Sequence, residues 1–109
     1  MWNGKRSNDE DGVYVARLGA IWESDRPGKS GYQFWVWEFD DLCEAETRRL
    51  AGPKDVLTSL SPKAHWKLKE IFEAFEESPH IDTDELIGRQ VGLELRGGEV
   101  RRVLPLVKR

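Results

Sequence analysis

Cysteine is almost missing from this chain of 109 residues, in which Cys43 stands alone. A single cysteine excludes an internal disulfide framework and fits a reducing compartment. Long apolar runs are missing too, and none approaches the roughly 20 residues of a membrane-spanning helix. The N-terminal stretch MWNGKRSNDEDG is polar, unlike the apolar core of a signal peptide. We therefore expect a cytoplasmic protein that has no membrane partner.

Histidine is scarce, and the sequence offers little for catalysis or metal binding. His65 follows Cys43 by 22 residues and His80 follows His65 by 15, spacings that match no metal-binding signature. No Ser-His-Asp arrangement can be read from the residue order. Residues 97–99, Gly-Gly-Glu, are typical of a turn and not of a phosphate loop. We expect a protein that is not an enzyme and that uses no cofactor and no metal.

Positive charge is in deficit for the chain as a whole, whose formal net charge is −3. Such a charge argues mildly against a polyanionic partner. The deficit is local, however: residues 40–86 hold six Lys/Arg against twelve Asp/Glu, whereas residues 87–109 hold six against two. A basic surface is therefore still possible near the C-terminal end.

The N-terminal part of the sequence predicts a long β-hairpin. The run GVYVARLGAIWESD (12–25) alternates as a half-buried strand does. Gly19 interrupts the run, and a glycine inside a strand often marks a bulge or a sharp bend. The turn RPGKSG (26–31) then leads back into GYQFWVWEF (31–39), so the two runs read as paired strands.

One helix and a second hairpin complete the predicted elements. SPKAHWKLKEIFEAFEE (61–77) places apolar residues at helical spacing behind a capping Ser-Pro, which predicts a helix over about residues 62–77. DTDELIG (82–88) predicts a single capped turn. Gly97-Gly98 predicts a tight turn between two closing strands.

These elements predict a single domain over residues 12–107, behind a flexible N-terminal lead-in of residues 1–11. Two hairpins and one main helix indicate a mainly β fold, namely a small OB-like barrel in which a first strand bent at Gly19 serves both sheets. The alternative is an α+β open sheet with one docked helix. Residues 40–57 have no clear period and fit either a short helix over residues 44–50 or an insertion.

Aromatic residues gather on the returning strand GYQFWVWEF, and both of its faces carry them. Stacking of a nucleobase on such a ring contributes about 1–3 kcal/mol in single-strand binders, in which Lys and Arg hold the phosphates. The candidate nucleic-acid-binding residues are Trp22, Arg26, Lys29, Tyr32, Trp35 and Trp37 on the first hairpin, with Arg89, Arg96, Arg101 and Arg102 on the second. The structural alternative is that the tryptophans fill the core and the arginines protect strand edges.

Several short motifs follow one another in a familiar order. They are a G-x-Y-x-A opening strand at Gly12–Ala16, a helix start at Ser61–Ala64 followed by Lys67 and Leu68, the segment Glu85–Val91, and a closing Leu104-Pro105. In these motifs the chain resembles small phage-encoded single-stranded-DNA-binding proteins of the OB-fold type. The resemblance implies an OB fold, DNA binding in phage replication or recombination, and a location in the host bacterial cytoplasm.

Two functions follow as expectations. The leading one is non-catalytic, sequence-tolerant binding of single-stranded DNA, with arginines on the phosphates and exposed aromatic rings on the bases. The alternative is a protein–protein interaction domain that uses the same aromatic surface, since a large exposed apolar patch commonly marks an interface. Such a domain would form a homodimer, or would act on a host protein as a phage inhibitor or adaptor. Phage or host replication and recombination proteins are the further partners expected.

Overall fold

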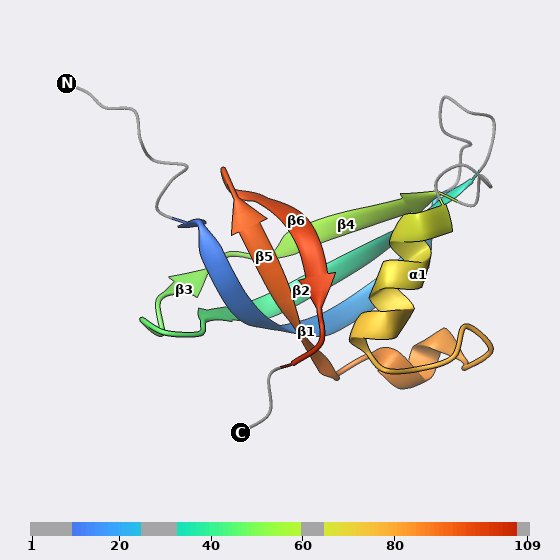
Figure 1. The fold of residues 1–109 in the computed structure, drawn as a ribbon. Helices are drawn as coiled ribbons and strands as arrows, with labels where there is room; N and C mark the ends of the chain where they lie inside the picture. Colours follow the sequence, from blue (N-terminus) through green and yellow to red (C-terminus); the bar gives the residue numbers. More distant parts are fainter. Residues whose placement is uncertain (1–9, 25–32, 60–64, 107–109) are drawn as a thin grey trace.

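The computed structural model describes residues 10–24, 33–59 and 65–106, and in these residues six strands and one α-helix form the fold (Figure 1). The strands are β1 (Gly12–Glu23), β2 (Phe34–Glu44), β3 (Leu50–Ala51), β4 (Lys54–Ser59), β5 (Gln90–Arg96) and β6 (Glu99–Leu104); the helices are α1 (His65–Ala74) and the short 3-10 helix η3 (Thr83–Leu86). The predicted mainly β fold with one main helix is confirmed. No helix in this part of the chain has the length and apolarity that crossing a membrane requires.

β1 lies at the centre of one antiparallel sheet with the order β3-β2-β1-β5-β6, while β4 pairs with β2. β1 pairs with β2 from Tyr14 to Glu23, but with β5 only over residues 12–17. One strand thus serves both halves of the sheet, as an OB-like arrangement requires. β5 and β6 form the predicted closing hairpin, and its turn residues Gly97 and Gly98 have positive φ angles of 64° and 83°.

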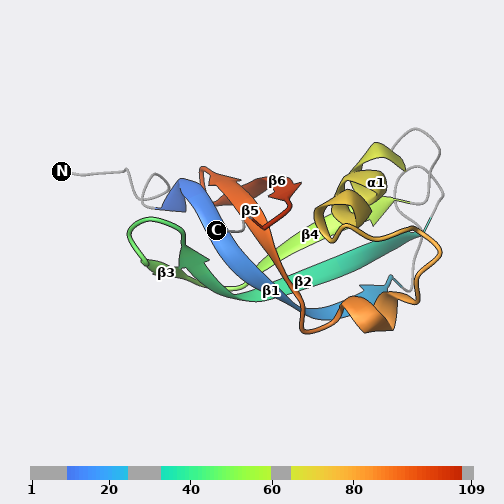
Figure 2. The ribbon, with the colours of Figure 1, turned by 60° about the horizontal axis from the view of Figure 1, so that its bottom comes forward.

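β1 bends at Gly19, as the sequence predicts. Its pairing register with β2 shifts between Leu18 and Ala20. A Cβ atom at position 19 would collide with the carboxylate of Asp40 on β2, so any larger residue there would displace that side chain. Figure 2 shows the resulting curve of β1 and β2, with β5, β6 and α1 on its concave side.

The core lies between the curved strands and α1. β1 contributes the alternating residues Tyr14, Ala16 and Leu18, whose exposed fraction is 0 %, as the period of two predicts. The side chains that pack around them come from β2, α1, the turn after α1 and β5: Trp37, Phe39, Leu68, Ile71, Phe72, Phe75, Val91, Leu93 and Leu95.

α1 occupies the open side of the sheet and bonds to the edge of β6 through polar side chains. Glu70 Oε2 accepts a hydrogen bond from the Val103 N–H at 2.7 Å, and Lys67 Nζ donates one to the Arg101 carbonyl at 3.3 Å. These bonds satisfy edge groups that a neighbouring strand would otherwise pair with. Among the described residues no strand pairing joins β4 to β6, so the sheet is not closed. The fold therefore fits both an OB-like arrangement and an open sheet with a docked helix.

Residues 40–57 differ from their prediction, because they hold the end of β2 together with β3 and β4. A turn stands in place of the predicted helix over residues 44–50. Glu44 Oε1 accepts hydrogen bonds from the N–H groups of Glu46 and Thr47 at 2.8 and 2.5 Å. Arg48 then has a φ of 64°, in the left-handed region that an α-helix of L-residues excludes.

The two helices keep their predicted order but not all of their predicted bounds. α1 ends at Ala74 and not near residue 77, because Glu76 has a φ of 59°. The predicted start near residue 62 lies outside the described residues. The capped turn predicted over residues 82–88 is present as η3, and Asp82 caps it, since its side chain accepts the N–H of Asp84 at 3.0 Å.

Glu10 and Asp11, the last two residues of the predicted lead-in, contact the sheet, at β4 and at the β5–β6 turn. Residues 1–9 lie outside the described part of the chain, but the last two residues are held in place. Glu10 forms an ion pair with Lys54 at 2.7 Å, and Asp11 Oδ1 accepts the N–H of Gly97 at 2.7 Å. The described domain therefore begins before β1, because both carboxylates reach the neighbouring strands.

Protonation of Glu44 is expected to loosen the turn that follows β2. Hydrogen bonds, first those from the backbone N–H and the hydroxyl of Thr47, hold the pKa of the Glu44 carboxyl below its ordinary value. A carboxyl whose pKa is lower in the folded state contributes stability above its unfolded pKa, and this stability is lost as the pH falls through the folded pKa. Between about pH 7 and pH 3, Glu44→Gln should therefore lose less free energy of unfolding than wild type in urea titrations. Equal losses in the two proteins would contradict this role.

Candidate nucleic-acid interface

Trp37 belongs to the core, so the prediction that it stacks on bases is wrong. Its exposed fraction is 0 %. Its indole Nε1 donates a hydrogen bond to Thr58 Oγ1 at 2.9 Å, and its ring meets Phe72 edge-on with centroids 6.1 Å apart. Neither face of the ring is open to a nucleobase.

Trp35 and Trp22, the other two predicted tryptophans on the first hairpin, differ from each other in exposure. Trp35 is half-buried and packs against the core, with its ring centroid 6.1 Å from that of Trp37. Trp22 is 48 % exposed, on the outer face of the sheet. Its Nε1 donates to Glu38 Oε2 at 2.6 Å, and Asp55 stands opposite Glu38 on β4. A phosphate backbone on Trp22 would therefore meet carboxylates, which repel it.

Arg89 and Arg96 on the second hairpin are held by neighbouring groups. Arg89 Nη2 donates to the Phe75 carbonyl at 3.0 Å, and Nη1 forms an ion pair with Glu77 at 2.9 Å. Arg89 thus ties the start of β5 to the residues that follow α1. Arg96 is exposed and lies 3.6 Å from Glu94 in an ion pair. Both arginines have structural partners that a phosphate would have to displace.

Arg101 and Arg102 are exposed on β6, and neither forms an ion pair with any other described residue. The register of β5 and β6 shifts after Glu94, which leaves Arg101 as the extra residue of a bulge. Bulges redirect a side chain away from the regular alternation of a strand. The Arg101 carbonyl accepts the hydrogen bond from Lys67, so this arginine stands next to α1. The remaining predicted residues, Arg26, Lys29 and Tyr32, lie outside the described part of the chain.

Trp66 is the functional candidate that the sequence-based prediction missed. It is 63 % exposed, more than any other tryptophan that the structure describes. The sequence contains a signal for it, because Trp66 stands almost opposite the apolar stripe of α1, which includes Leu68, Ile71 and Phe72. A tryptophan on the polar face of a helix does not serve the core.

Two lysines of α1, Lys67 and Lys69, lie near the Trp66 ring. Lys67 Nζ lies 5.2 Å from the centroid of the Trp66 ring. On the other side Trp66 lines a cavity of about 280 Å³ together with His65, Leu68, Lys69, Phe72 and Pro79. Glu70 also lies near, but its carboxylate is taken by Lys67 at 3.1 Å and by the Val103 N–H. Within α1 the charges of Lys67 and Lys69 are balanced by Glu70 and Glu73, so the excess of positive charge near the ring comes from the arginines of β6.

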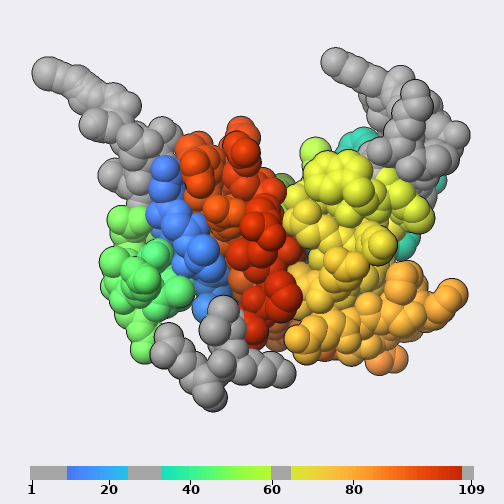
Figure 3. Space-filling view, viewed as in Figure 1, coloured from blue at the N-terminus to red at the C-terminus, as the bar shows by residue number. Residues whose placement is uncertain are grey.

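α1 and β6 lie side by side on one face of the molecule (Figure 3). We call the surface formed by Trp66, Lys67, Lys69, Arg101 and Arg102 the α1/β6 surface. It combines an exposed aromatic ring with cations from two neighbouring elements, which is what a single-strand binder needs. In the described part of the chain, no three His, Cys, Asp or Glu side chains gather as metal ligands would.

Comparison of the chain with family models and with curated proteins finds no match to either. The function is therefore argued from the α1/β6 surface and from the chemistry of its side chains.

Proposed function

We propose that the protein binds single-stranded DNA without catalysis and without sequence preference, through the α1/β6 surface. The observation that carries the proposal is the exposure of Trp66 between Lys67 and Lys69 and beside Arg101. Every base offers a π-face, so stacking on one ring tolerates any sequence. The resemblance to phage-encoded single-strand binders supports phage replication or recombination, in the cytoplasm of the host bacterium, as the setting.

The roles of the side chains follow from their positions. A base stacks on Trp66, with the apolar wall of the adjoining cavity behind it. Lys69, Arg101 and Arg102 hold phosphates on either side of the ring. Lys67 supports the site, because it is bonded to Glu70 and to β6 and holds α1 at the strand edge.

The usual binding face of OB folds is an unfavourable path for DNA in this protein. OB folds commonly bind oligonucleotides on the face of their second and third strands. The corresponding strands are β2 and β4, whose outer face carries Glu38 and Asp55 in cross-strand register. Repulsion between these carboxylates and phosphates favours the α1/β6 surface over that face.

The proposal predicts that the two β6 arginines set the salt dependence of binding. Replacing both with glutamine, as Arg101→Gln/Arg102→Gln, should reduce the slope of log K against log salt concentration by about 1.4, since each single-strand phosphate contact contributes roughly 0.7. Titrations of tryptophan fluorescence with oligo-dT at several salt concentrations measure the slope. The control is Arg48→Gln/Arg96→Gln, which removes the same charge from the turn after β2 and from the β5–β6 hairpin.

An equal reduction of the slope in the two double variants would contradict the proposed surface, because it would show that only the net charge matters. Absence of any binding by the wild-type protein at low salt would contradict DNA binding itself.

A further inference from the structure

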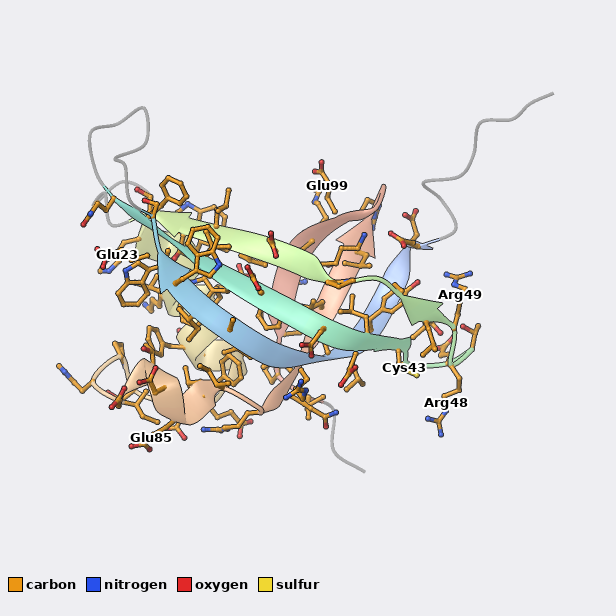
Figure 4. The ribbon with its side chains drawn as sticks, turned by 180° about the vertical axis from the view of Figure 1, so that it is seen from behind. Glu23, Cys43, Arg48, Arg49, Glu85 and Glu99 are labelled. Carbon is orange, nitrogen blue, oxygen red and sulfur yellow. The ribbon has the colours of Figure 1, made fainter. Side chains whose placement is uncertain are left out.

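The outer face of β1, β2 and β4 carries two rows of side chains in cross-strand register. In Figure 4 these three strands lie in front of α1 and β6. The first row is apolar and consists of Trp22, Val36 and Leu57. The second row consists of Ala20, Glu38 and Asp55. We call the two rows together the acidic face.

The apolar row is exposed at both ends. Trp22 is 48 % and Leu57 60 % exposed, while Val36 between them is buried at 3 %. A tryptophan and a leucine that face water across three strands contribute nothing to the core, which lies on the opposite side of the sheet. An apolar row of this kind beside polar side chains is typical of a protein interface.

The pairing of two carboxylates in the acidic row is unfavourable for the fold. Like charges directly opposite each other in a sheet destabilise it, and Glu38 and Asp55 are such a pair. Neither has a cation within 4.0 Å among the residues that the structure describes. The carboxylate of Glu38 is held in place by the Trp22 indole at 2.6 Å. Locally unfavourable pairs of this kind concentrate at functional sites.

We propose that the acidic face docks a basic segment of a partner protein. A Lys or Arg of that segment would sit between Glu38 and Asp55 and remove their repulsion. A guanidinium in this position can also lie over the Trp22 ring in a cation–π contact. An apolar side chain of the segment would cover Trp22 and Leu57.

The negative charge of the acidic face favours a basic segment over a nucleic acid and over a second copy of this chain. Phosphates of a nucleic acid would add negative charge to the carboxylate pair. Face-to-face pairing of two copies of this chain would bring the carboxylate pairs of both copies together, which is equally unfavourable. The acidic face and the α1/β6 surface belong to different sides of the molecule (Figures 3 and 4). A partner can therefore dock whether or not DNA is bound, and the inference does not depend on the proposed function.

A labelled decapeptide of alternating arginine and leucine is a suitable probe, with fluorescence anisotropy as the measurement and the full chain as the protein. The double variant Glu38→Gln/Asp55→Asn should bind this peptide at least about tenfold more weakly than wild type. The control Glu73→Gln/Glu76→Gln removes one charge from α1 and one from the turn that follows it, and should bind as wild type does. A peptide with glutamate in place of arginine should not bind.

Thermal unfolding gives a second measurement on the same variants. Glu38→Gln/Asp55→Asn should raise the unfolding midpoint by about 1–5 °C, because it relieves a repulsion that the fold itself does not need. Loss of peptide binding in a more stable protein would separate docking from folding. Equal weakening of peptide binding in both double variants, or unchanged binding in Glu38→Gln/Asp55→Asn, would overturn the proposal. A wild-type dimer in sedimentation that this variant dissociates would overturn it in favour of a second copy.

Discussion

Replacement of Trp66 by alanine is expected to weaken the binding of oligo-dT by about 5- to 150-fold, which corresponds to a stacking contribution of roughly 1–3 kcal/mol. The reason is that Trp66 offers an exposed ring between two lysines. The loss should appear at every salt concentration, since stacking releases few counterions, and the salt slope should stay close to that of wild type. Anisotropy of labelled oligo-dT measures the affinity without relying on tryptophan fluorescence.

Trp22 provides the matched control for this experiment. It is the other exposed tryptophan on a described strand or helix, but it is bonded to Glu38 on the acidic face. Trp22→Ala should therefore leave the affinity for oligo-dT unchanged. Because both residues are on the surface, both variants should remain folded, with free energies of unfolding close to that of wild type. A loss of affinity in Trp22→Ala but not in Trp66→Ala would place DNA on the acidic face and contradict the proposed surface.

Replacement of Trp37 by alanine is expected to lower the free energy of unfolding by about 3–5 kcal/mol. Trp37 is fully buried and lies at the contact between β2, β4 and α1. Its removal would leave a cavity lined by Phe72 and its neighbours. A loss of this size is a large part of the 5–15 kcal/mol by which domains are usually stable. Urea unfolding followed by circular dichroism measures it.

Thr58→Val separates the hydrogen bond of Trp37 from its packing. Valine has nearly the shape of threonine but lacks the hydroxyl that accepts the indole N–H at 2.9 Å. A buried donor without an acceptor costs about 1–3 kcal/mol, so this variant should be destabilised by that amount with an unchanged dependence on urea. Wild-type stability in Thr58→Val would show that another acceptor reaches the indole.

The sequence predicts the elements that depend on local signals. The alternation of Tyr14, Ala16 and Leu18 on β1 is such a signal, and so are the bend at Gly19, the capped turn over residues 82–88 and the closing Gly-Gly turn. Each of them is decided by residues close together in the chain. Tertiary contacts therefore did not change these local structures.

β4 could not be predicted in the same way, because its pattern runs against the usual one. Thr58 faces the core and Leu57 faces solvent, which reverses the usual preference of threonine and leucine. Thr58 is inside because Trp37, 21 residues earlier, requires an acceptor there. The acidic face could not be predicted either, because Glu38 and Asp55 become neighbours only when β4 pairs with β2.

The tryptophans show which part of the candidate site could be predicted from the sequence. A strand with aromatic residues on both faces does not reveal which face is buried, so Trp37 could not be assigned to the core in advance. The exposure of Trp66 could be predicted from the sequence, because its position off the apolar stripe of α1 marks it as a surface residue. The cations around Trp66 could not be predicted, because Lys67 and Arg101 come together only where α1 bonds to the edge of β6.

The most direct test of the central claim is a map of backbone amide chemical shifts in the wild-type protein during titration with oligo-dT at low salt. The account predicts that the largest shifts occur over residues 65–69 of α1 and 101–103 of β6, and that residues 36–38 and 55–57 on the acidic face stay unchanged. Shifts centred on those residues of β2 and β4, or no shifts at all, would contradict the proposal that this protein binds single-stranded DNA through the α1/β6 surface.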